Sequence, residues 1–185
     1  MPWWAVLSAT CAPVLLIGGW QLAAGRQPGG FDPARQTISA LGARGATDRW
    51  IMTTGLAGAG ICHVMTALGL RPVAVPGRLL LAIGGAATVS LATLPQLVTG
   101  DSTAHVAAAA IVFPALSLWP ALAWRRGAKI RPAVWLAAAS GLLGMLGWFG
   151  FEFFGDGPRI GLSERALVGA QALWPLAAVL LTRRC

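Results

Sequence analysis

Six long stretches without a charged side chain dominate this sequence of 185 residues. Ionisable side chains are costly in the hydrocarbon core of a bilayer, and about 20 apolar residues are needed to cross that core. The lengths of the stretches predict six transmembrane helices, at about residues 3–25, 50–70, 79–100, 103–124, 133–153 and 166–182. We therefore expect an all-α integral membrane bundle, in which one domain covers residues 1–185 and short loops join antiparallel neighbours.

The composition favours the same class of protein. Charged residues make up 11% of the chain, compared with about 25% in soluble domains. So little polar surface cannot coat a water-soluble globule, which argues against a soluble enzyme, a disordered chain or a disulfide scaffold. The net charge of +8 comes from scattered basic residues without an aromatic-basic motif, so no nucleic-acid partner is expected.

The charges are divided unequally between the two sides of this predicted bundle. The side with the N-terminus, the second and fourth loops and the C-terminus carries eight basic residues and no acid. The opposite side carries six arginines and all six acids. Basic loops favour the cytoplasmic leaflet, so we expect a multi-pass protein of the plasma membrane with both termini in the cytoplasm.

Glycines recur at short intervals in two of the predicted helices. Small residues let helix backbones approach closely within a membrane, so these glycines predict tight packing, with a ligand cavity as the alternative. They are Gly55, Gly58 and Gly60 in the second helix and Gly141, Gly144, Gly147 and Gly150 in the fifth.

Two carboxylates close the fifth predicted helix. Glu152 and Asp156 are four residues apart, and mutual repulsion together with apolar neighbours would favour the protonated form of one of them. Such an acid can donate a proton, and aromatic rings beside it can stabilise a cation. The alternative is an ion pair of Glu152 with Arg159 or Arg165. The aromatic residues expected to bind substrate here are Trp148, Phe149, Phe151, Phe153 and Phe154.

Further polar residues are expected on the same side. Asp101 and His105 share one face at the start of the fourth helix, as a proton-transfer pair or metal ligands, or as a helix cap beside an interfacial histidine. Glu164 opens the sixth helix, where the helix dipole alone would favour it, and Gln171 lies two turns deeper. Only two histidines are present, at different depths, so we expect no metal site and no cofactor.

The first loop, residues 26–49, is the longest connection. Connections of this length are usually functional or ordered against the rest of the fold. Residues 36–41 are compatible with a short interfacial helix that ends at Gly42. We expect Asp32 and Ser39 of this loop to contribute to substrate binding, together with Gln171.

Motifs on this side resemble those of a known family. The first loop contains Phe31-Asp32-Pro33, then Thr37-Ile38-Ser39-Ala40-Leu41-Gly42 and Asp48-Arg49-Trp50, and the last helix contains Gly161-Leu162, Glu164-Arg165, Gln171 and Leu173-Trp174-Pro175. The chain resembles the small integral-membrane proteins of domain-of-unknown-function family 998 (DUF998), of the actinobacterial type. The resemblance implies six helices and a shared role for these polar elements, and it assigns no activity.

Three functions are compatible with these residues. The first is an intramembrane enzyme that uses Glu152, Asp156, Asp101, His105 and Glu164 for acid-initiated cyclisation or isomerisation of a polyprenyl, terpenoid or related lipid substrate. The second is a non-catalytic lipid-binding or accessory protein, whose acids and arginines form neutralising pairs that hold the long loop. The third is a subunit of a small proton-coupled transporter. The expected partner in the first two cases is a membrane lipid or isoprenoid.

Overall fold

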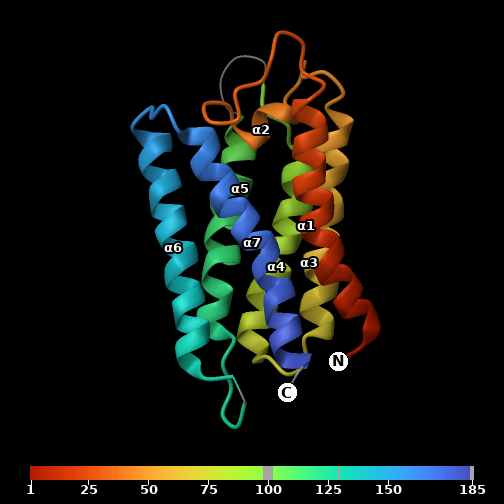
Figure 1. Cartoon of the computed structure of the whole chain (residues 1–185), viewed down its shortest axis with the longest axis vertical. Coiled ribbons are helices and arrows are strands. Elements are labelled where there is room, and N and C mark those ends of the chain that lie inside the picture. The colour runs from red at the N-terminus through yellow and green to blue at the C-terminus, as the bar shows by residue number, and fades with distance from the viewer. Residues whose placement is uncertain (98–101, 129, 184–185) are drawn as a thin grey trace.

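The computed structural model describes residues 1–97, 102–128 and 130–183, and within them six long helices form one bundle (Figure 1). All six are long and apolar enough to cross a membrane, which confirms the predicted all-helical fold with six candidate spans. The long helices are α1 (Trp3–Ala24), α3 (Trp50–Gly69), α4 (Val75–Thr93), α5 (Thr103–Leu118), α6 (Pro132–Phe154) and α7 (Ile160–Arg183). A one-turn helix, α2 (Ile38–Leu41), lies in the first loop, and the 3₁₀ turn η1 (Trp119–Leu122) extends α5.

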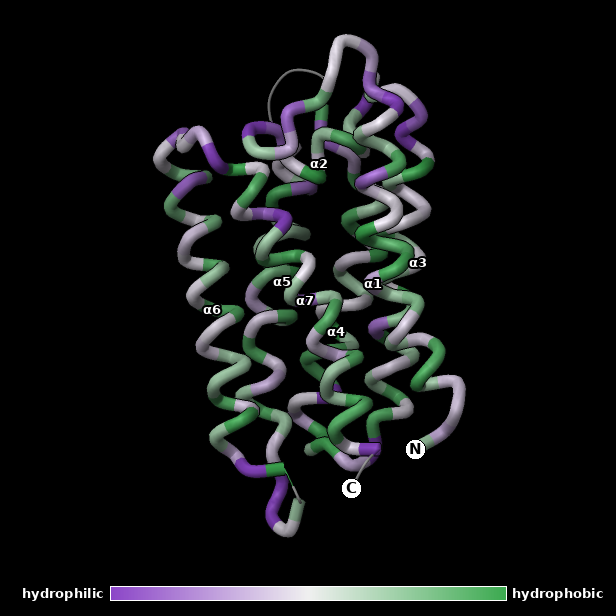
Figure 2. The backbone as a smooth tube through the Cα atoms, in the orientation of Figure 1, coloured by the Kyte–Doolittle hydropathy of each residue, from purple (hydrophilic) through white to green (hydrophobic). Residues whose placement is uncertain are grey.

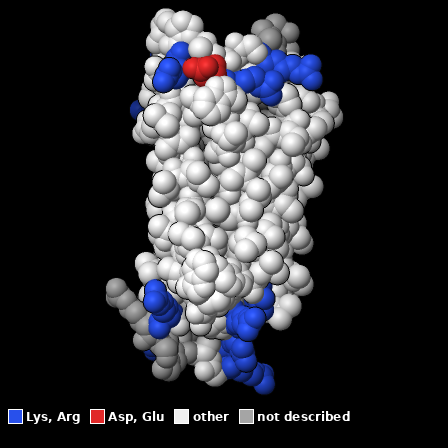
Figure 3. All heavy atoms as spheres, turned by 90° about the vertical axis from the view of Figure 1, so that its right-hand side faces the viewer, with Lys and Arg blue, Asp and Glu red and all other residues white. Residues whose placement is uncertain are grey.

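The bundle has an apolar middle and two polar ends (Figure 2). We call the end that carries α2 the loop end, and the opposite end, where α1 begins and α7 finishes, the terminus end. On the face shown in Figure 3, basic side chains lie at both ends, and acidic side chains appear at the loop end only. An uncharged band separates the two ends, as a bilayer-spanning protein requires.

Two helices begin earlier than the uncharged stretches predict. Helix α7 begins at Ile160 instead of residue 166, so that Glu164 and Arg165 lie inside it. Both side chains have polar partners in the first loop, which is why these two charged residues are tolerated inside the helix. Helix α4 begins at Val75 instead of residue 79, with a proline in its first turn, where the missing N–H costs nothing.

Two helices also end earlier than predicted. Helix α4 ends at Thr93 because the residue before Pro95 disfavours the helical conformation; residues 98–100 of the predicted span lie outside the described residues. Helix α5 tightens into η1 after Leu118, where Pro120 follows.

Glycines bring α3 close to its neighbours, as predicted. A Cβ added at Gly60 would lie 2.6 Å from the carbonyl oxygen of Gly85 on α4, and one added at Gly55 would lie 2.9 Å from that of Leu15 on α1. The same prediction is wrong for α6. A Cβ added at Gly141, Gly144, Gly147 or Gly150 would meet nothing within 4 Å, so these glycines face open space.

Helix α6 is the most loosely held of the six. Only 17% of its membrane-spanning window is buried, compared with 33–44% for the other helices. Near the terminus end Trp135 packs edge-on against Trp119 and Trp174, with ring centroids 6.0 Å apart in each pair. Closer to the loop end than Trp135, Phe149 packs against Phe113 of α5, with ring centroids 5.1 Å apart. These ring contacts fix α6 while leaving room between α5 and α6.

Candidate functional site

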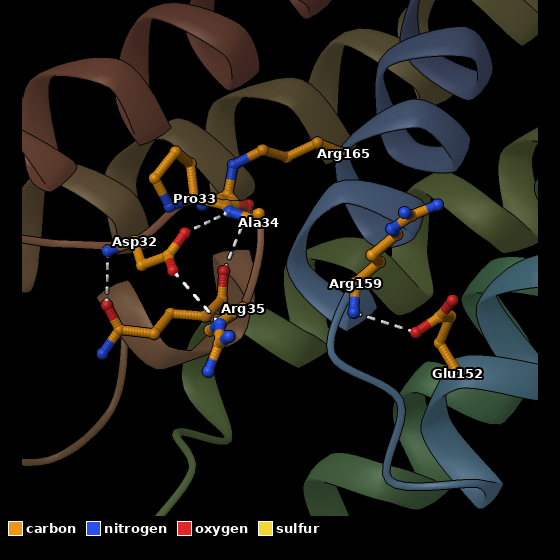
Figure 4. A network of polar contacts seen from close by, with 8 residues as sticks. Asp32, Pro33, Ala34, Arg35, Glu152, Arg159 and Arg165 are labelled. Atoms are coloured by element: carbon orange, nitrogen blue, oxygen red, sulfur yellow. Dashed lines mark hydrogen bonds and ion pairs between the residues drawn. The ribbon is translucent and has the colours of Figure 1, made fainter.

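The first loop is folded onto the start of α7. One terminal nitrogen of Arg165, Nη1, donates to the carbonyl oxygens of Pro33 (2.8 Å), Gln36 (2.7 Å) and Gly161 (2.9 Å). The guanidinium of Arg165 also lies 5.3 Å from the ring centre of Phe31, a cation–π distance. Figure 4 shows loop residues Asp32 to Arg35 beside Arg165. The long loop is therefore an ordered part of the bundle.

A close backbone contact supports this arrangement. The backbone N–H of Leu162 donates to the carbonyl of Ala34 at 3.1 Å. A Cβ added at Gly161 would lie 2.7 Å from the carbonyl oxygen of Pro33, so only glycine allows the loop to lie this close to α7.

The short helix α2 forms where the sequence predicts one. Thr37 caps it by accepting the backbone N–H of Ala40 at 3.2 Å, and Gly42 ends it. Ile38 and Leu41 are buried against the bundle, whereas Ser39 between them is half-buried. One turn of helix thus fixes Ser39 at the edge of the bundle interior.

Glu164 connects α7 to α2. Its side chain is only 3% exposed. One carboxylate oxygen, Oε2, accepts the backbone N–H of Ile38, and the other, Oε1, lies 3.3 Å from the hydroxyl of Ser39. A buried carboxyl group needs such partners, and here they come from the first loop instead of from an arginine.

His105 extends these contacts to α5 and α4. Its Nε2 lies 3.2 Å from the hydroxyl oxygen of Ser39, and its Nδ1 lies 2.7 Å from the carbonyl oxygen of Leu94. This carbonyl belongs to the residue that follows the end of α4. Because a carbonyl can only accept, Nδ1 carries a proton, and in a neutral imidazole Nε2 is left as an acceptor.

Ser39, His105 and Glu164 together form a hydrogen-bonded chain with two proton arrangements. A hydroxyl has one proton to donate and lone pairs that accept. When Ser39 donates to His105, it can accept a proton from a neutral Glu164 carboxyl group. When Ser39 donates to an ionised Glu164, it can accept from a protonated His105. The two arrangements differ by the passage of one proton through Ser39, so the chain can act as a proton relay.

The relay lies at the polar end of an apolar cavity of about 260 Å³ between α5 and α6. Thr37 and Gln96 line the same polar end as the three relay residues. The walls are apolar and include Phe113, Phe149 and Phe153. Two lining side chains lie on the bundle surface, Val106 with 38% and Phe154 with 87% exposure, so the cavity opens sideways between the two helices.

Glu152 does not line this cavity. It is buried at the end of α6, where one oxygen accepts the backbone N–H of Arg159 at 2.9 Å (Figure 4). The other oxygen accepts the indole N–H of Trp148 at 3.2 Å. The predicted alternative, an ion pair with the side chain of Arg159 or Arg165, does not occur among the described residues. The backbone of Arg159, not its guanidinium, binds this carboxylate. Glu152 thus fastens the turn between α6 and α7.

The remaining predicted residues are scattered. Asp156 is exposed in that turn, and Phe151 is 77% exposed on the outside of α6. Asp32 accepts the backbone N–H of Ala34 (2.9 Å) and pairs with Arg35 (3.6 Å), away from the cavity. Asp101 lies outside the described residues.

Gln171 belongs to a second, smaller cavity of about 30 Å³ in the middle of the bundle. Its amide nitrogen donates to the carbonyl of Phe113 and to the hydroxyl of Ser117, both at 2.9 Å. Glu164 and the buried His63 also line this space. The predicted aromatic residues Phe149, Phe153 and Phe154 line the larger cavity instead.

Several contributors to the site were not predicted from the sequence. Thr37, Gln96 and Phe113 line the cavity, and the carbonyl of Leu94 orients His105. The proline after Leu94 was the available signal, since it ends α4 just before this residue. Within the described part of the chain, no group of three or more potential metal-ligating side chains is present.

Comparison with known proteins gives a family and nothing closer. No curated protein and no solved structure matches the chain. The family model described as "Protein of unknown function (DUF998)" matches residues 10–181, which include the whole first loop and all or most of every helix. The chain is a member of the DUF998 family of multi-pass membrane proteins.

Proposed function

We propose that this protein is an intramembrane lipid-modifying enzyme, in which Ser39, His105 and Glu164 transfer protons to and from the polar or reactive group of a lipid. The observation that carries the proposal is the position of the relay at the polar end of a cavity that opens between α5 and α6. Its volume of about 260 Å³ is just below the range of about 300–1,000 Å³ that is usual for small-molecule sites. An apolar chain fits the walls, and a polar group fits the relay.

Acid-initiated isomerisation of a polyprenyl chain is one reaction that this site supports. It needs a carboxylic acid at the cavity, and Glu164 meets this requirement where Glu152 does not. A proton would add to one alkene carbon, and the resulting cation would lose a proton from a neighbouring carbon to the relay. Phe113, Phe149 and Phe153 line the cavity, and their faces can stabilise the cation.

A second candidate function is non-catalytic lipid binding, and one observation favours it. Glu164 accepts the backbone N–H of Ile38, and Arg165 beside it donates to three carbonyls, so both side chains hold the first loop in place. In this case the cavity binds a lipid, and the polar chain serves only to hold the protein together.

We also propose that the protein lies in the plasma membrane with its termini in the cytoplasm, which places the relay on the extracytoplasmic side. The uneven distribution of acids between the two ends supports this orientation. A cysteine-accessibility experiment on intact cells, with cysteine at Asp156, tests it. Labelling by a membrane-impermeant maleimide is expected, and protection until the cells are opened would contradict the orientation.

Lipid binding is tested by filling the cavity. Gly150 lines the cavity, and an added Cβ there meets nothing within 4 Å, so Gly150→Leu should fold and project into the space. Gly144→Leu is the matched control, because it has the same open surroundings on the same helix and does not line the cavity. Native mass spectrometry of the protein in detergent with added lipids is expected to show binding to the wild type and to Gly144→Leu, reduced at least tenfold in Gly150→Leu. Equal binding to all three would contradict the proposal.

Catalysis is tested on the same preparations. We expect conversion of linear polyprenyl compounds, detected by mass spectrometry, and its loss in Glu164→Gln but not in Asp156→Asn. Binding that Gly150→Leu blocks, without conversion of any lipid tested, would favour the non-catalytic function.

A further inference from the structure

We propose that Ser39 is also a nucleophile, which attacks the ester carbonyl of an acyl lipid held in the cavity, with His105 as its general base. This inference rests on the lipid cavity of the proposed function and names ester lipids as a substrate class. It does not depend on acid-initiated chemistry.

The geometry around Ser39 meets the requirements for an activated hydroxyl group. The nucleophile and its base must lie within about 2.6–3.2 Å, and a third group must orient the base. Ser39 Oγ lies 3.2 Å from Nε2 of His105, and the carbonyl of Leu94 lies 2.7 Å from Nδ1. The carbonyl takes the place that a carboxylate has in a Ser-His-Asp triad, and it leaves Nε2 free to take the proton of the hydroxyl.

The arrangement would be different if Ser39 only joined two helices. A structural link needs hydrogen bonds to its neighbours and no access to a cavity. Ser39 is half-buried and lines the cavity together with both of its partners, so an ester at the polar end can reach its oxygen. Thr37 lines the same end, and its oxygen accepts from Ala40, so its own O–H remains as a donor for the carbonyl oxygen of the ester.

The reaction follows from these positions. As Ser39 Oγ bonds to the ester carbon, its proton passes to Nε2 of His105. The bond between this carbon and the leaving oxygen then breaks, and His105 returns the proton to the departing alcohol. The acyl group is now on Ser39. Water, or the hydroxyl of a second lipid, attacks the acyl group in the same way, loses its proton to His105, and releases Ser39, which regains that proton.

A covalent probe tests this inference without knowledge of the natural substrate. The purified full-length protein in detergent is treated with a long-chain alkyl fluorophosphonate, and intact mass and peptide mapping locate the adduct. Wild type is expected to gain one phosphonyl group on Ser39, with release of fluoride. Ser39→Ala should gain none. Ser90→Ala is the matched control and should label like the wild type, because Ser90 is exposed on α4 and its hydroxyl donates to the carbonyl of Ala86 in the same helix.

Two further measurements distinguish a nucleophile from a structural serine. Loss of the general base in His105→Gln should slow labelling by about 100-fold or more. Gly150→Leu should slow labelling by the long-chain probe much more than labelling by a short-chain fluorophosphonate, since only the long chain needs the part of the cavity that the leucine occupies. This comparison does not depend on how well His105→Gln folds.

The outcomes separate the two proposals. No adduct on Ser39 of the wild type, or an equal labelling rate in a folded His105→Gln, would refute the nucleophile. If Gly150→Leu still blocks lipid binding in that case, the proposed function stands. If Gly150→Leu leaves lipid binding unchanged, the lipid cavity itself is refuted, and a labelled Ser39 would then belong to a different substrate.

Discussion

Conversion of a carboxyl group to an amide should have opposite consequences at the two buried glutamates. At Glu152 both oxygens face N–H donors, from Arg159 and Trp148. Glutamine offers one acceptor oxygen, so its NH₂ must face the other donor. At Glu164 one oxygen faces the N–H of Ile38 and the other faces the hydroxyl of Ser39. Here the glutamine oxygen can accept from the N–H of Ile38 and its NH₂ can donate to Ser39, whose hydroxyl then donates its hydrogen bond to His105.

The expected magnitudes follow from this difference. A buried donor left without an acceptor costs about 1–3 kcal/mol, so Glu152→Gln should lose about 2 kcal/mol of unfolding free energy. Glu164→Gln leaves no donor unpaired and should lose less than about 1 kcal/mol. For a chain of this size, 1 kcal/mol corresponds to about 2–4 °C in Tm. We therefore expect a decrease of about 4–8 °C for Glu152→Gln and of less than about 4 °C for Glu164→Gln.

Thermal unfolding in detergent, followed by tryptophan fluorescence, measures both changes. Asp156→Asn is the control, because it makes the same chemical change at an exposed position and should stay within about 1 °C of the wild type. An unchanged Tm for Glu152→Gln would refute the assignment of Glu152 to the α6–α7 turn. A decrease in Tm for Glu164→Gln as large as that for Glu152→Gln would refute the proposed alternation of hydrogen-bond donors and acceptors among Ser39, His105 and Glu164.

Three further predictions concern the surroundings of the site. Gly60→Ala should lower the unfolding free energy by about 1–3 kcal/mol, because its Cβ would overlap Gly85. Gly144→Ala, in open space, should be neutral or stabilising by up to about 1 kcal/mol. Thermal unfolding measures both changes, and equal effects would contradict the close packing of α3 against α4. Arg165→Lys should expose the first loop to trypsin several-fold faster in limited proteolysis, because a lysine ammonium at the carbonyls has no planar guanidinium face to stack on Phe31. Arg159→Lys should not, because only the backbone of Arg159 is used, and similar cleavage in both variants would refute the role of Arg165. Gly157→Ala should destabilise the protein, because its Cβ would lie 2.8 Å from the carboxyl carbon of Glu152. The double variant with Glu152→Gln should lose less unfolding free energy than the sum of the two single variants, and full additivity would show that the two residues do not interact.

The fold could be predicted from the distances between charges because the bilayer excludes unpaired ions. The same rule misplaced the start of α7, where Glu164 and Arg165 lie within the helix and are bonded to a loop more than 120 residues earlier in the chain. Glycine spacing failed on α6 for a related reason. A repeat of small residues shows that a helix can be approached closely, but whether a neighbour does so depends on the packing of the whole bundle.

The site was harder to predict than the helices. Ser39, His105 and Glu164 each belonged to the predicted set, but the predicted proton donor was one of the pair Glu152 and Asp156, because these carboxylates are close together and Glu152 has aromatic neighbours. Spacing along one helix identifies residues on a shared face, whereas the relay draws one residue from each of three separate elements. The orienting group of His105 is a backbone carbonyl, which no side-chain pattern reveals.

The depth of the relay agrees with the way a lipid lies in a bilayer. Glu164 is four residues from the start of α7 and His105 two residues from the start of α5, which places both within about 6 Å of the loop end of their helices. Phe113, on the apolar wall, lies ten residues along α5, or about 15 Å deep. The cavity therefore runs from a shallow polar end to a deep apolar part, the same direction in which a lipid chain descends from its head group. Under the proposed function, a lipid would enter between α5 and α6 without turning over or leaving the membrane, because α6 is the least buried helix and its glycines face open space. In the proposed enzyme, a reactive group near the lipid head group would then lie at the same depth as Ser39.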